Sequence, residues 1–394
     1  MSHRTHALRS VLVSAIAATA CSDSTTSPAR PQLSPYVSAA HVLESGTSSV
    51  MWNQTARDLI ASRAVTSPIN QVRIMTYLSV AQYNAVIAAE DAKHGTDRPS
   101  PAAAIAGASL VVLKSFFPLD AAFLDGKLQG QESGAPWPGE HKTDFDDGEA
   151  IGLVIGAQVN AYAATDNFNL TVPPVNPGGS GNWTGVNSIR GLFGARTFAL
   201  TSGDQFRPGP PPAFGSATFL AALAEVRAIT DARTPAQLAI AVTWAGQGPA
   251  FMNSLATGMI VDHNRSEREG ARLLALANMA AFDVANACYD AKFAYYLIRP
   301  SQADLSINLG VPLPNHPSYP SGHSCITSAY ATILADEFPQ ESTRLQAIVE
   351  ESGMARIYGG LHYRFDLLAG RELGRQVANY VLFVTGKKRA IPLD

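Results

Sequence analysis

Three short blocks of charged and small residues between positions 292 and 366 constrain the fold of this chain more than any other feature. Within these 75 residues the chain carries three spaced cations, two histidines, a Ser-Gly turn and an aspartate. The blocks read Lys292-x6-Arg299-Pro300, Pro320-Ser321-Gly322-His323 and Arg356-x3-Gly360-x-His362-x3-Asp366. Such a set of residues suits one kind of site, a pocket for a tetrahedral oxyanion with two or three negative charges.

The cations of the first block are spaced for such a pocket. Arginine offers a planar fork of donors and lysine a compact point charge, and both are used to bind phosphate-like anions. Lys292 and Arg299 are seven residues apart, so a continuous helix would place both on one face. Pro300 disfavours helical backbone at the residue before it, so we expect Arg299 at the end of this helix.

The second and third blocks add donors and a proton-transfer pair. An apolar run follows the Ser-Gly turn, which places Ser321 and Gly322 at a helix N-terminus, where free backbone N–H groups and the helix dipole bind anions. His362 and Asp366 are four residues apart and share a face if this segment is helical. The carboxylate would then fix the tautomer of the imidazole and raise its basicity.

In this order and spacing, the three blocks resemble the signature of the type 2 phosphatidic acid phosphatase (PAP2) and vanadium-dependent haloperoxidase superfamily. The similarity is greatest to its bacterial haloperoxidase-like members. One departure is Ala355, where the third block usually opens with serine. Weaker similarity extends upstream, to residues 205–208 and to the helical segment 77–89. The resemblance implies an all-α fold of two bundles, with the anion site at the mouth of the C-terminal one.

The resemblance also implies a role for each matching residue. His362 would be the vanadate ligand of a haloperoxidase, and so bind the vanadium, or the phosphorylated nucleophile of a phosphatase. His323 would be the acid–base partner, and Asp366 would orient His362. The oxygens of vanadate or phosphate would be held by Lys292, Arg299, Ser321, Gly322 and Arg356.

Two reactions are compatible with this site. In a haloperoxidase, bound vanadate would take up hydrogen peroxide and the cationic pocket would polarise it toward halide attack. In a phosphomonoesterase, His362 would attack phosphorus and His323 would protonate the leaving oxygen. A third class, a non-catalytic oxyanion-binding protein of the envelope, would not need two histidines. The length of the chain and its long upstream helical half favour the haloperoxidase.

Two further residues bear on the halide. His316 opens the turn His316-Pro-Ser-Tyr-Pro-Ser-Gly-His323, which is similar to bromoperoxidases, where a histidine lines the site. Tyr289 stands where chloroperoxidases tend to have tryptophan. This halide and substrate pocket therefore predicts bromide or iodide rather than chloride, while the organic substrate and the oligomeric state stay open.

Composition narrows the class of partner. Charged residues make up 15% of the 394 residues and hydrophobic residues 46%, so the chain can bury a sizeable core. The net charge is −3 and the chain has no basic block, which argues against a nucleic-acid partner. The acidic residues are scattered, so a divalent-metal site is poorly supported.

The N-terminus resembles an export signal. Arg4 and Arg9 precede a ten-residue apolar stretch, too short to span a membrane, and Cys21 follows small residues as in a bacterial lipoprotein. We expect residues 1–21 to direct export to the periplasm or cell envelope, or secretion, with a lipid anchor at Cys21 as the alternative to a plain secretory signal. Residues 22–48, rich in Ser, Thr and Pro, would be a flexible tether.

The remaining chain reads as helices around one long break. Apolar residues at three- and four-residue spacing predict packed antiparallel bundles. We expect an N-terminal helical half at 49–165, an ordered Pro/Gly-rich crossover at 166–214, and a C-terminal half with the site at 215–394. No stretch of eighteen uncharged apolar residues occurs, so no transmembrane helix is expected in the mature chain. The expected helices cover 50–64, 69–92, 101–117, 143–165, 215–230, 235–245, 253–262, 265–298, 324–338, 341–357 and 362–385.

Three residues outside the motifs allow two interpretations. Cys288 and Cys325 are either two buried thiols or, because they lie near the motif lysine and histidine, a disulfide. Arg207 either adds a cation at the mouth of the pocket or forms a surface salt bridge.

Overall fold

The computed structural model describes residues 47–94, 98–134, 141–168, 175–185, 192–386 and 390–393. The expected export signal, Cys21 and all but the last two residues of the tether lie outside these ranges. The described chain is helical and contains no β-strand, which confirms the predicted all-α class. Its helices are α2 (Ser48–Ser62), α3 (Pro68–Asp91), α4 (Pro101–Phe116), η1 (Pro118–Asp120), α5 (Ala121–Gly134), α6 (Lys142–Ala164), α7 (Ala217–Asp231), α8 (Pro235–Gly246), α9 (Pro249–Asp262), α10 (Glu267–Tyr295), α11 (Pro300–Ala303), α12 (Gly322–Glu337), η2 (Pro339–Glu341), α13 (Ser342–Tyr358) and α14 (Arg364–Thr385).

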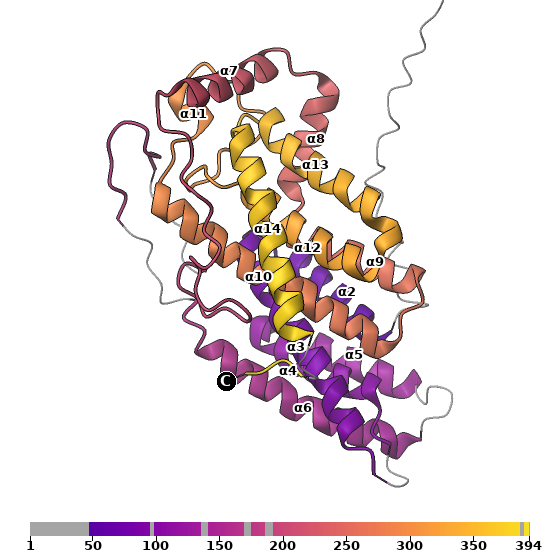
Figure 1. Cartoon of the computed structure of the whole chain (residues 1–394). Coiled ribbons are helices and arrows are strands. Elements are labelled where there is room, and N and C mark those ends of the chain that lie inside the picture. Colours follow the sequence, from indigo (N-terminus) through magenta and orange to yellow (C-terminus); the bar gives the residue numbers. More distant parts are fainter. Residues whose placement is uncertain are drawn as a thin grey trace, which may run out of the picture. The chain divides into compact units, whose positions relative to one another are not determined.

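The N-terminal bundle is built on close helix packing. Helices α4 and α6 lie together in Figure 1, with α3 beside them. Alanines of α4 face glycines of α6, and a side chain at Gly152 would overlap the Ala104 carbonyl oxygen. The missing side chains let the two backbones approach, so this bundle gains its contact area from backbone proximity.

The C-terminal bundle packs α12 and α14 against α10, with α13 beside α12 (Figure 1). Its apolar cluster joins residues of α9, α10, α12, α13 and α14. Helix α10 also contributes Ala271, Ala275 and Met279 to the apolar cluster of the N-terminal bundle. The two predicted bundles are therefore present, and they share one 29-residue helix.

Two buried aspartates hold the crossover between the bundles. Asp283 on α10 accepts the backbone N–H groups of Phe198, Ala199 and Leu200 at 2.7–3.0 Å. Asp166 accepts from Arg73 and from the Tyr77 hydroxyl, each at 2.8 Å. Fixed carboxylates that satisfy loop N–H groups allow an irregular segment to pack against a core.

Several predicted helix boundaries are wrong, and the physical reasons are local. The helix expected to reach residue 298 ends at Tyr295, because Tyr296 takes a left-handed conformation with φ of 47°. The helix expected from residue 143 begins at Lys142, and His141 is its N-cap. The helix expected from residue 362 begins at Arg364.

Helix α5 was not predicted. Three glycines, at positions 126, 130 and 134, fall on this helix of 14 residues and hide its apolar period. Glycine disfavours a helix by about 1 kcal/mol per residue, so α5 depends on its packing against α4 and η1.

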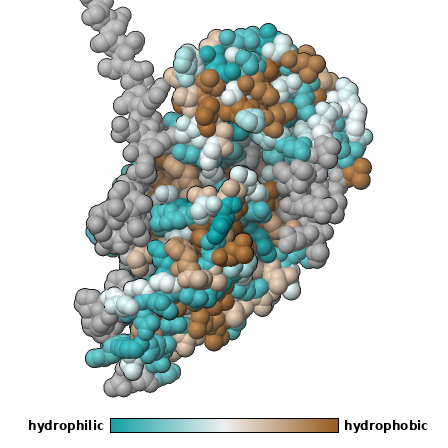
Figure 2. Space-filling model, turned by 180° about the vertical axis from the view of Figure 1, so that it is seen from behind, coloured by the Kyte–Doolittle hydropathy of each residue, from teal (hydrophilic) through white to brown (hydrophobic). Residues whose placement is uncertain are grey.

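Some apolar side chains remain on the surface. Leu220, Leu238 and Val242 of α7 and α8 are exposed. Figure 2 shows apolar atoms gathered at the end of the molecule that carries these helices. Over the described residues, no helix combines the length and apolar character that crossing a bilayer requires.

Candidate active site

The Pro-Ser-Gly-His turn forms the N-terminus of α12, as predicted. Ser321 is the N-cap, and its hydroxyl accepts the N–H of Ser324 at 3.5 Å. Its own N–H donates to the Asp366 carbonyl at 3.0 Å, which fixes the start of α12 against α14. The backbone N–H groups of the first helical turn, beginning at Gly322, form the anion-binding end of the helix dipole.

Arg299 is fully buried, but it does not share a helical face with Lys292, because α10 has already ended. Its guanidinium donates to the carbonyls of His316 and Leu361 at 3.0 and 2.9 Å. It also lies 3.1 Å from Nε2 of His362 and 3.0 Å from Nδ1 of His316. Since arginine only donates, Nε2 of His362 accepts this hydrogen bond and carries no proton. Nδ1 of His316 also lies 3.1 Å from the Pro317 carbonyl oxygen, which can only accept.

Lys292 is fully buried in the last turn of α10. Its ammonium group donates to the carbonyls of Pro317, Ser318 and Pro320 at 2.8, 2.8 and 2.6 Å. All three of its hydrogens are therefore used to fix the 317–320 turn. Burial lowers the pKa of Lys292 to about 8.

Arg356 differs from the other two cations. It lies in the last turn of α13 and is 4% exposed. Its Nε and Nη1 are buried and meet no acceptor among the described residues. Burial, and then the nearby Arg299, lower the pKa of Arg356 to about 9. Unpaired donors on a buried cation are costly. Arg356 is therefore suited to donate hydrogen bonds to an anionic ligand.

His362 and Asp366 form the predicted pair, although His362 lies before α14 rather than on it. The carboxylate accepts from His362 Nδ1 at 2.8 Å, from Ser318 Oγ at 2.5 Å and from the Tyr363 N–H at 3.2 Å. Nδ1 therefore carries the proton, and the lone pair of Nε2 points toward Arg299. Burial, and then Arg299, lower the pKa of His362 well below its usual value. Burial raises the pKa of Asp366 to about 6.

His323, in the first turn of α12, is partly exposed. Its Nε2 lies 3.0 Å from the carbonyl oxygen of Trp244, at the end of α8, so this nitrogen carries the proton in the structure. Burial, and then Arg356, lower the pKa of His323 to about 3. The ring is therefore neutral near pH 7.

Two neighbours of His323 were missed from the sequence. Trp244 supplies the carbonyl, and Gln247 in the α8–α9 turn buries a side-chain oxygen that no described residue contacts by hydrogen bond. The signal present in the sequence was the break Gly246-Gln247-Gly248-Pro249 between two apolar helices. That break marks a turn, but nothing in it points to a residue about 75 positions away.

The two residues assigned to the halide pocket lie side by side. The ring centres of Tyr289 and His316 are 5.4 Å apart. Tyr289 is 9% exposed, and burial raises its pKa. Burial, and then Lys292, lower the pKa of His316 well below its usual value. Together the rings form an aromatic wall next to Arg299.

The charges of the site set the charge of its ligand. Three buried cations face one buried carboxylate, so two positive charges lack a partner, and the three histidines are neutral near pH 7. A tetrahedral dianion would neutralise the two unpartnered positive charges, and its oxygens would accept hydrogen bonds from Arg356. In the described ranges, no group of three or more His, Cys, Asp or Glu side chains could hold a metal cation.

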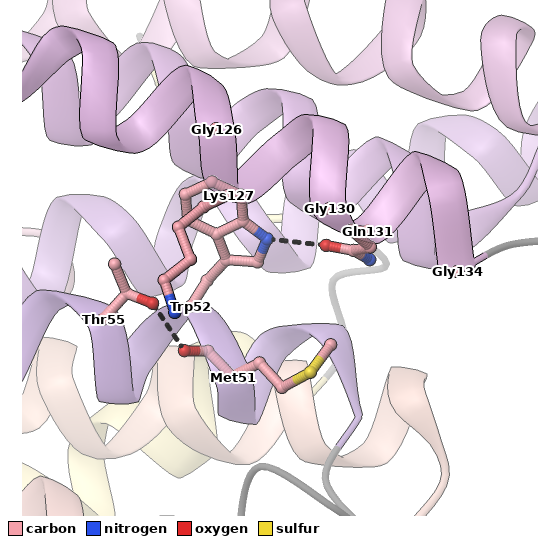
Figure 3. A pocket seen from close by; sticks show the side chains of 8 residues that line it. All are labelled: Met51, Trp52, Thr55, Gly126, Lys127, Gly130, Gln131 and Gly134. Atoms are coloured by element: carbon pink, nitrogen blue, oxygen red, sulfur yellow. Dashed lines mark hydrogen bonds between the residues drawn. The ribbon is translucent and has the colours of Figure 1, made fainter.

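Two grooves lie outside this site. One, of about 350 Å³, separates α2 from α5 and is lined by Met51, Trp52, Lys127 and the glycine row of α5 (Figure 3). The other, of about 530 Å³, lies between α14 and residues 205–209, where Arg207 pairs with Asp290 at 2.6 Å. Arg207 thus forms the predicted alternative, a surface salt bridge. Neither groove contains buried unpaired donors for an oxyanion.

Known proteins confirm the resemblance read from the three blocks. Residues 271–390 match the model of the PAP2 superfamily. The matched residues contain all three blocks, and we call this region the PAP2 domain below. No curated protein sequence shows significant similarity to the chain.

The fold around the PAP2 domain is also found in solved structures. A bacterial vanadium-dependent iodoperoxidase aligns with a TM-score of 0.71 and 23% identity, over 84% of this chain and 94% of that one. A holo-type bacterial vanadium-dependent chloroperoxidase aligns with a TM-score of 0.64 and 14% identity, over 82% of this chain and 92% of that one. An apo-type bacterial vanadium-dependent chloroperoxidase aligns with a TM-score of 0.65 and 13% identity, over 82% of this chain and 95% of that one. The shared fold thus includes the N-terminal bundle, which lies outside the PAP2 domain.

Proposed function

We propose that this protein is a vanadate-dependent haloperoxidase that oxidises bromide or iodide with hydrogen peroxide. The observation that carries the proposal is the donor set around His362. A buried, Asp-oriented imidazole presents an unprotonated Nε2 beside two uncompensated positive charges and the unpaired donors of Arg356. These residues fit vanadate, a tetrahedral oxyanion whose metal takes a neutral imidazole nitrogen as ligand.

Each residue has a stated task in binding. His362 Nε2 would bind vanadium in place of its contact with Arg299, and Asp366 holds the tautomer that keeps this nitrogen unprotonated. Arg299, Arg356, Ser321 and the Gly322 N–H would hold the oxygens. Lys292, whose donors are taken by the 317–320 turn, contributes its charge and the position of that turn.

The protein supplies the proton transfer. Vanadate, when bound, supplies a Lewis-acidic centre that activates hydrogen peroxide without changing oxidation state. His323 is neutral near pH 7 and would take a proton from hydrogen peroxide and return it later in the cycle. Tyr289 and His316 line the side on which we place the halide.

The alternative is an acid phosphatase of the PAP2 type. The same lone pair of His362 Nε2 would attack phosphorus, and His323 would serve the leaving oxygen. Support for the haloperoxidase comes from the bundle of α2–α6, which lies outside the PAP2 domain and is included in the alignment with the iodoperoxidase.

A paired assay on the purified chain tests the proposal. One half supplies orthovanadate, hydrogen peroxide and bromide or iodide with a halogen-acceptor dye, and the other supplies p-nitrophenyl phosphate without vanadate. We expect peroxide-dependent halogenation that phosphate suppresses and that His362→Ala abolishes. Phosphate release that vanadate inhibits, without halogenation, would replace the haloperoxidase by the phosphatase. Retained turnover in His362→Ala would contradict the site under either reaction.

A further inference from the structure

Two cysteines lie against the floor of the anion site and take no part in the proposed chemistry. Cys288 is on α10 and Cys325 is on α12, and they are 1% and 0% exposed. Neither is bonded to another cysteine in the described chain. Gly322 and Cys325 are three residues apart and share a face of α12, and a side-chain carbon at Gly322 would lie 4.0 Å from the Cys288 sulfur. The two cysteines therefore lie on facing sides of packed helices, the placement from which a disulfide can form.

Cys288 also contacts the anion-binding turn. Its sulfur lies 3.8 Å from the Pro320 carbonyl oxygen, the same oxygen that accepts from Lys292 at 2.6 Å. A side-chain carbon at Gly322 would lie 4.0 Å from this sulfur. The Cys288 side chain therefore packs between Lys292 and the start of α12.

Gly322 lies between the Cys288 sulfur and the partly exposed part of the site. Gly322 and His323 are partly exposed, whereas both thiols are enclosed. A molecule of peroxide size at the N-terminus of α12 is separated from the Cys288 sulfur by a glycine without a side chain. We therefore take the oxidant to approach the sulfur past Gly322.

We propose that hydrogen peroxide oxidises Cys288 and Cys325 to a disulfide, and that this bond weakens oxyanion binding. The Cys288 sulfur attacks one peroxide oxygen, the O–O bond breaks, and a sulfenic acid and one water form. The Cys325 sulfur then attacks the sulfenic sulfur, the S–O bond breaks and a second water leaves. Two thiols and one peroxide give one disulfide and two waters. The proposed function enters only as the source of peroxide.

The disulfide affects the site because α12 cannot yield. A side-chain carbon at Gly370 of α14 would lie 2.7 Å from the Ser321 carbonyl oxygen, and one at Gly374 would overlap that of Cys325. The backbones of α12 and α14 are therefore already in contact. The sulfurs must come within about 2.05 Å of each other. Cys288 supplies this movement and leaves the Pro320 carbonyl, so the turn that Lys292 holds is displaced.

The first measurement is the bond itself. The full-length chain is reduced, treated with hydrogen peroxide without vanadate, denatured, alkylated and digested with trypsin. Cleavage after Lys292 places the two cysteines in different peptides, and both are distinct from the peptide of Cys21. We expect a linked pair of peptides that dithiothreitol separates. Sulfinic acid at Cys288 without a link, or two alkylated thiols, would overturn the proposal.

The second measurement is the effect on binding. Orthovanadate and inorganic phosphate are titrated against the reduced and the oxidised chain by calorimetry. We expect at least a fivefold loss of affinity on oxidation that dithiothreitol restores. Cys325→Ala and Cys325→Ser, both unable to form the bond, should keep the affinity of the reduced chain after peroxide. A linked chain with unchanged affinity, or an equal loss in both variants, would refute the switch.

These readouts separate the inference from the proposed function. Phosphate binding and the peptide link do not require halide oxidation. A chain without haloperoxidase activity that nevertheless forms the link and loses phosphate affinity would contradict the function and support the switch.

Discussion

The three cations of the site are all buried, but they differ in their hydrogen-bond partners. Arg299 and Lys292 donate to backbone carbonyls of the 316–320 and 361 segments, whereas two nitrogens of Arg356 meet no described acceptor. The sequence predicted all three residues, because the blocks carry them at fixed spacing. It could not assign their hydrogens, because the accepting carbonyls belong to turns whose path depends on tertiary packing.

Replacing Asp366 with asparagine should weaken the site without unfolding it. The amide keeps the shape but removes the charge that orients His362 and accepts three hydrogen bonds. Loss of such a partner usually costs about 10- to 100-fold in affinity or activity. We expect vanadate affinity and halide turnover to fall in this range, measured by titration and steady-state kinetics.

Ser318→Ala is the matched control for this change. It removes one donor to the same carboxylate and leaves the charge, so we expect less than about a tenfold loss. Equal effects of the two variants would show that the charge of Asp366 has no role beyond its hydrogen bonds.

His323 should make the fold sensitive to acid. Burial lowers its pKa to about 3, while an unfolded histidine titrates near 6.5, so the unfolded chain binds one more proton between these values. Stability from this group is therefore present above pH 6.5 and is lost as the pH falls toward 3. We expect His323→Gln to reduce the slope of unfolding free energy between pH 4 and 6, by up to about 1.4 kcal/mol per pH unit.

Urea unfolding at several pH values measures this slope. The wild-type chain, measured in the same buffers, is the reference. An unchanged slope in His323→Gln would mean that His323 is protonated in the folded protein.

At the scale of the elements, apolar periodicity predicted most helices. It failed where local backbone preferences oppose the helical pattern. The strong apolar run of α10 gave no sign that Tyr296 turns left-handed, so Arg299 was placed on the wrong element. In α5 the glycines suppressed the pattern, although tertiary packing maintains the helix. Trp244 and Gln247 were not predicted as site residues, because they come close to His323 only when α8 packs beside the C-terminal bundle.

Two glycine-to-alanine changes should have opposite effects. An added methyl at Gly152 of α6 would overlap the backbone of α4, so we expect a loss of about 1–3 kcal/mol in unfolding free energy. At Gly126, which lies on the open side of α5, no described atom falls within 4 Å of the new carbon (Figure 3). Alanine should there stabilise the protein by about 0.5–1 kcal/mol, because glycine is a poor helix former.

Chemical denaturation of both variants gives these free energies. The change at Gly152 should be seen with an unaltered denaturant slope, since the two states keep their exposed areas. A neutral result at Gly152 would mean that α4 and α6 can separate without loss of packing.

At the scale of the whole molecule, one helix joins the two bundles and the site. Helix α10 contributes apolar residues to both core clusters, holds the crossover through Asp283 and carries Lys292. The order of the three blocks in sequence predicted that α10, α12, α13 and the start of α14 meet. The resemblance predicted that the upstream helices form a bundle of their own, the N-terminal bundle. Periodicity alone predicts these helices but not their arrangement.

The last prediction concerns how the ligand and the fold stabilise each other. Without an anion, Arg356 is a buried charge with unpaired donors, so its replacement by methionine removes an uncompensated cost. We expect Arg356→Met to raise the unfolding free energy of the anion-free protein by about 1–2 kcal/mol. With phosphate or vanadate at 100 times the dissociation constant, the wild type should gain about 2.7 kcal/mol and become more stable than the variant, which gains little.

The control is Arg375→Met on α14, where the arginine is exposed and paired with Glu372. This change should alter the unfolding free energy by no more than about 0.5 kcal/mol, with or without the anion. Thermal unfolding with and without the anion measures this crossing, and an Arg356→Met protein that is less stable in both conditions would show that Arg356 is held by the fold rather than reserved for a ligand.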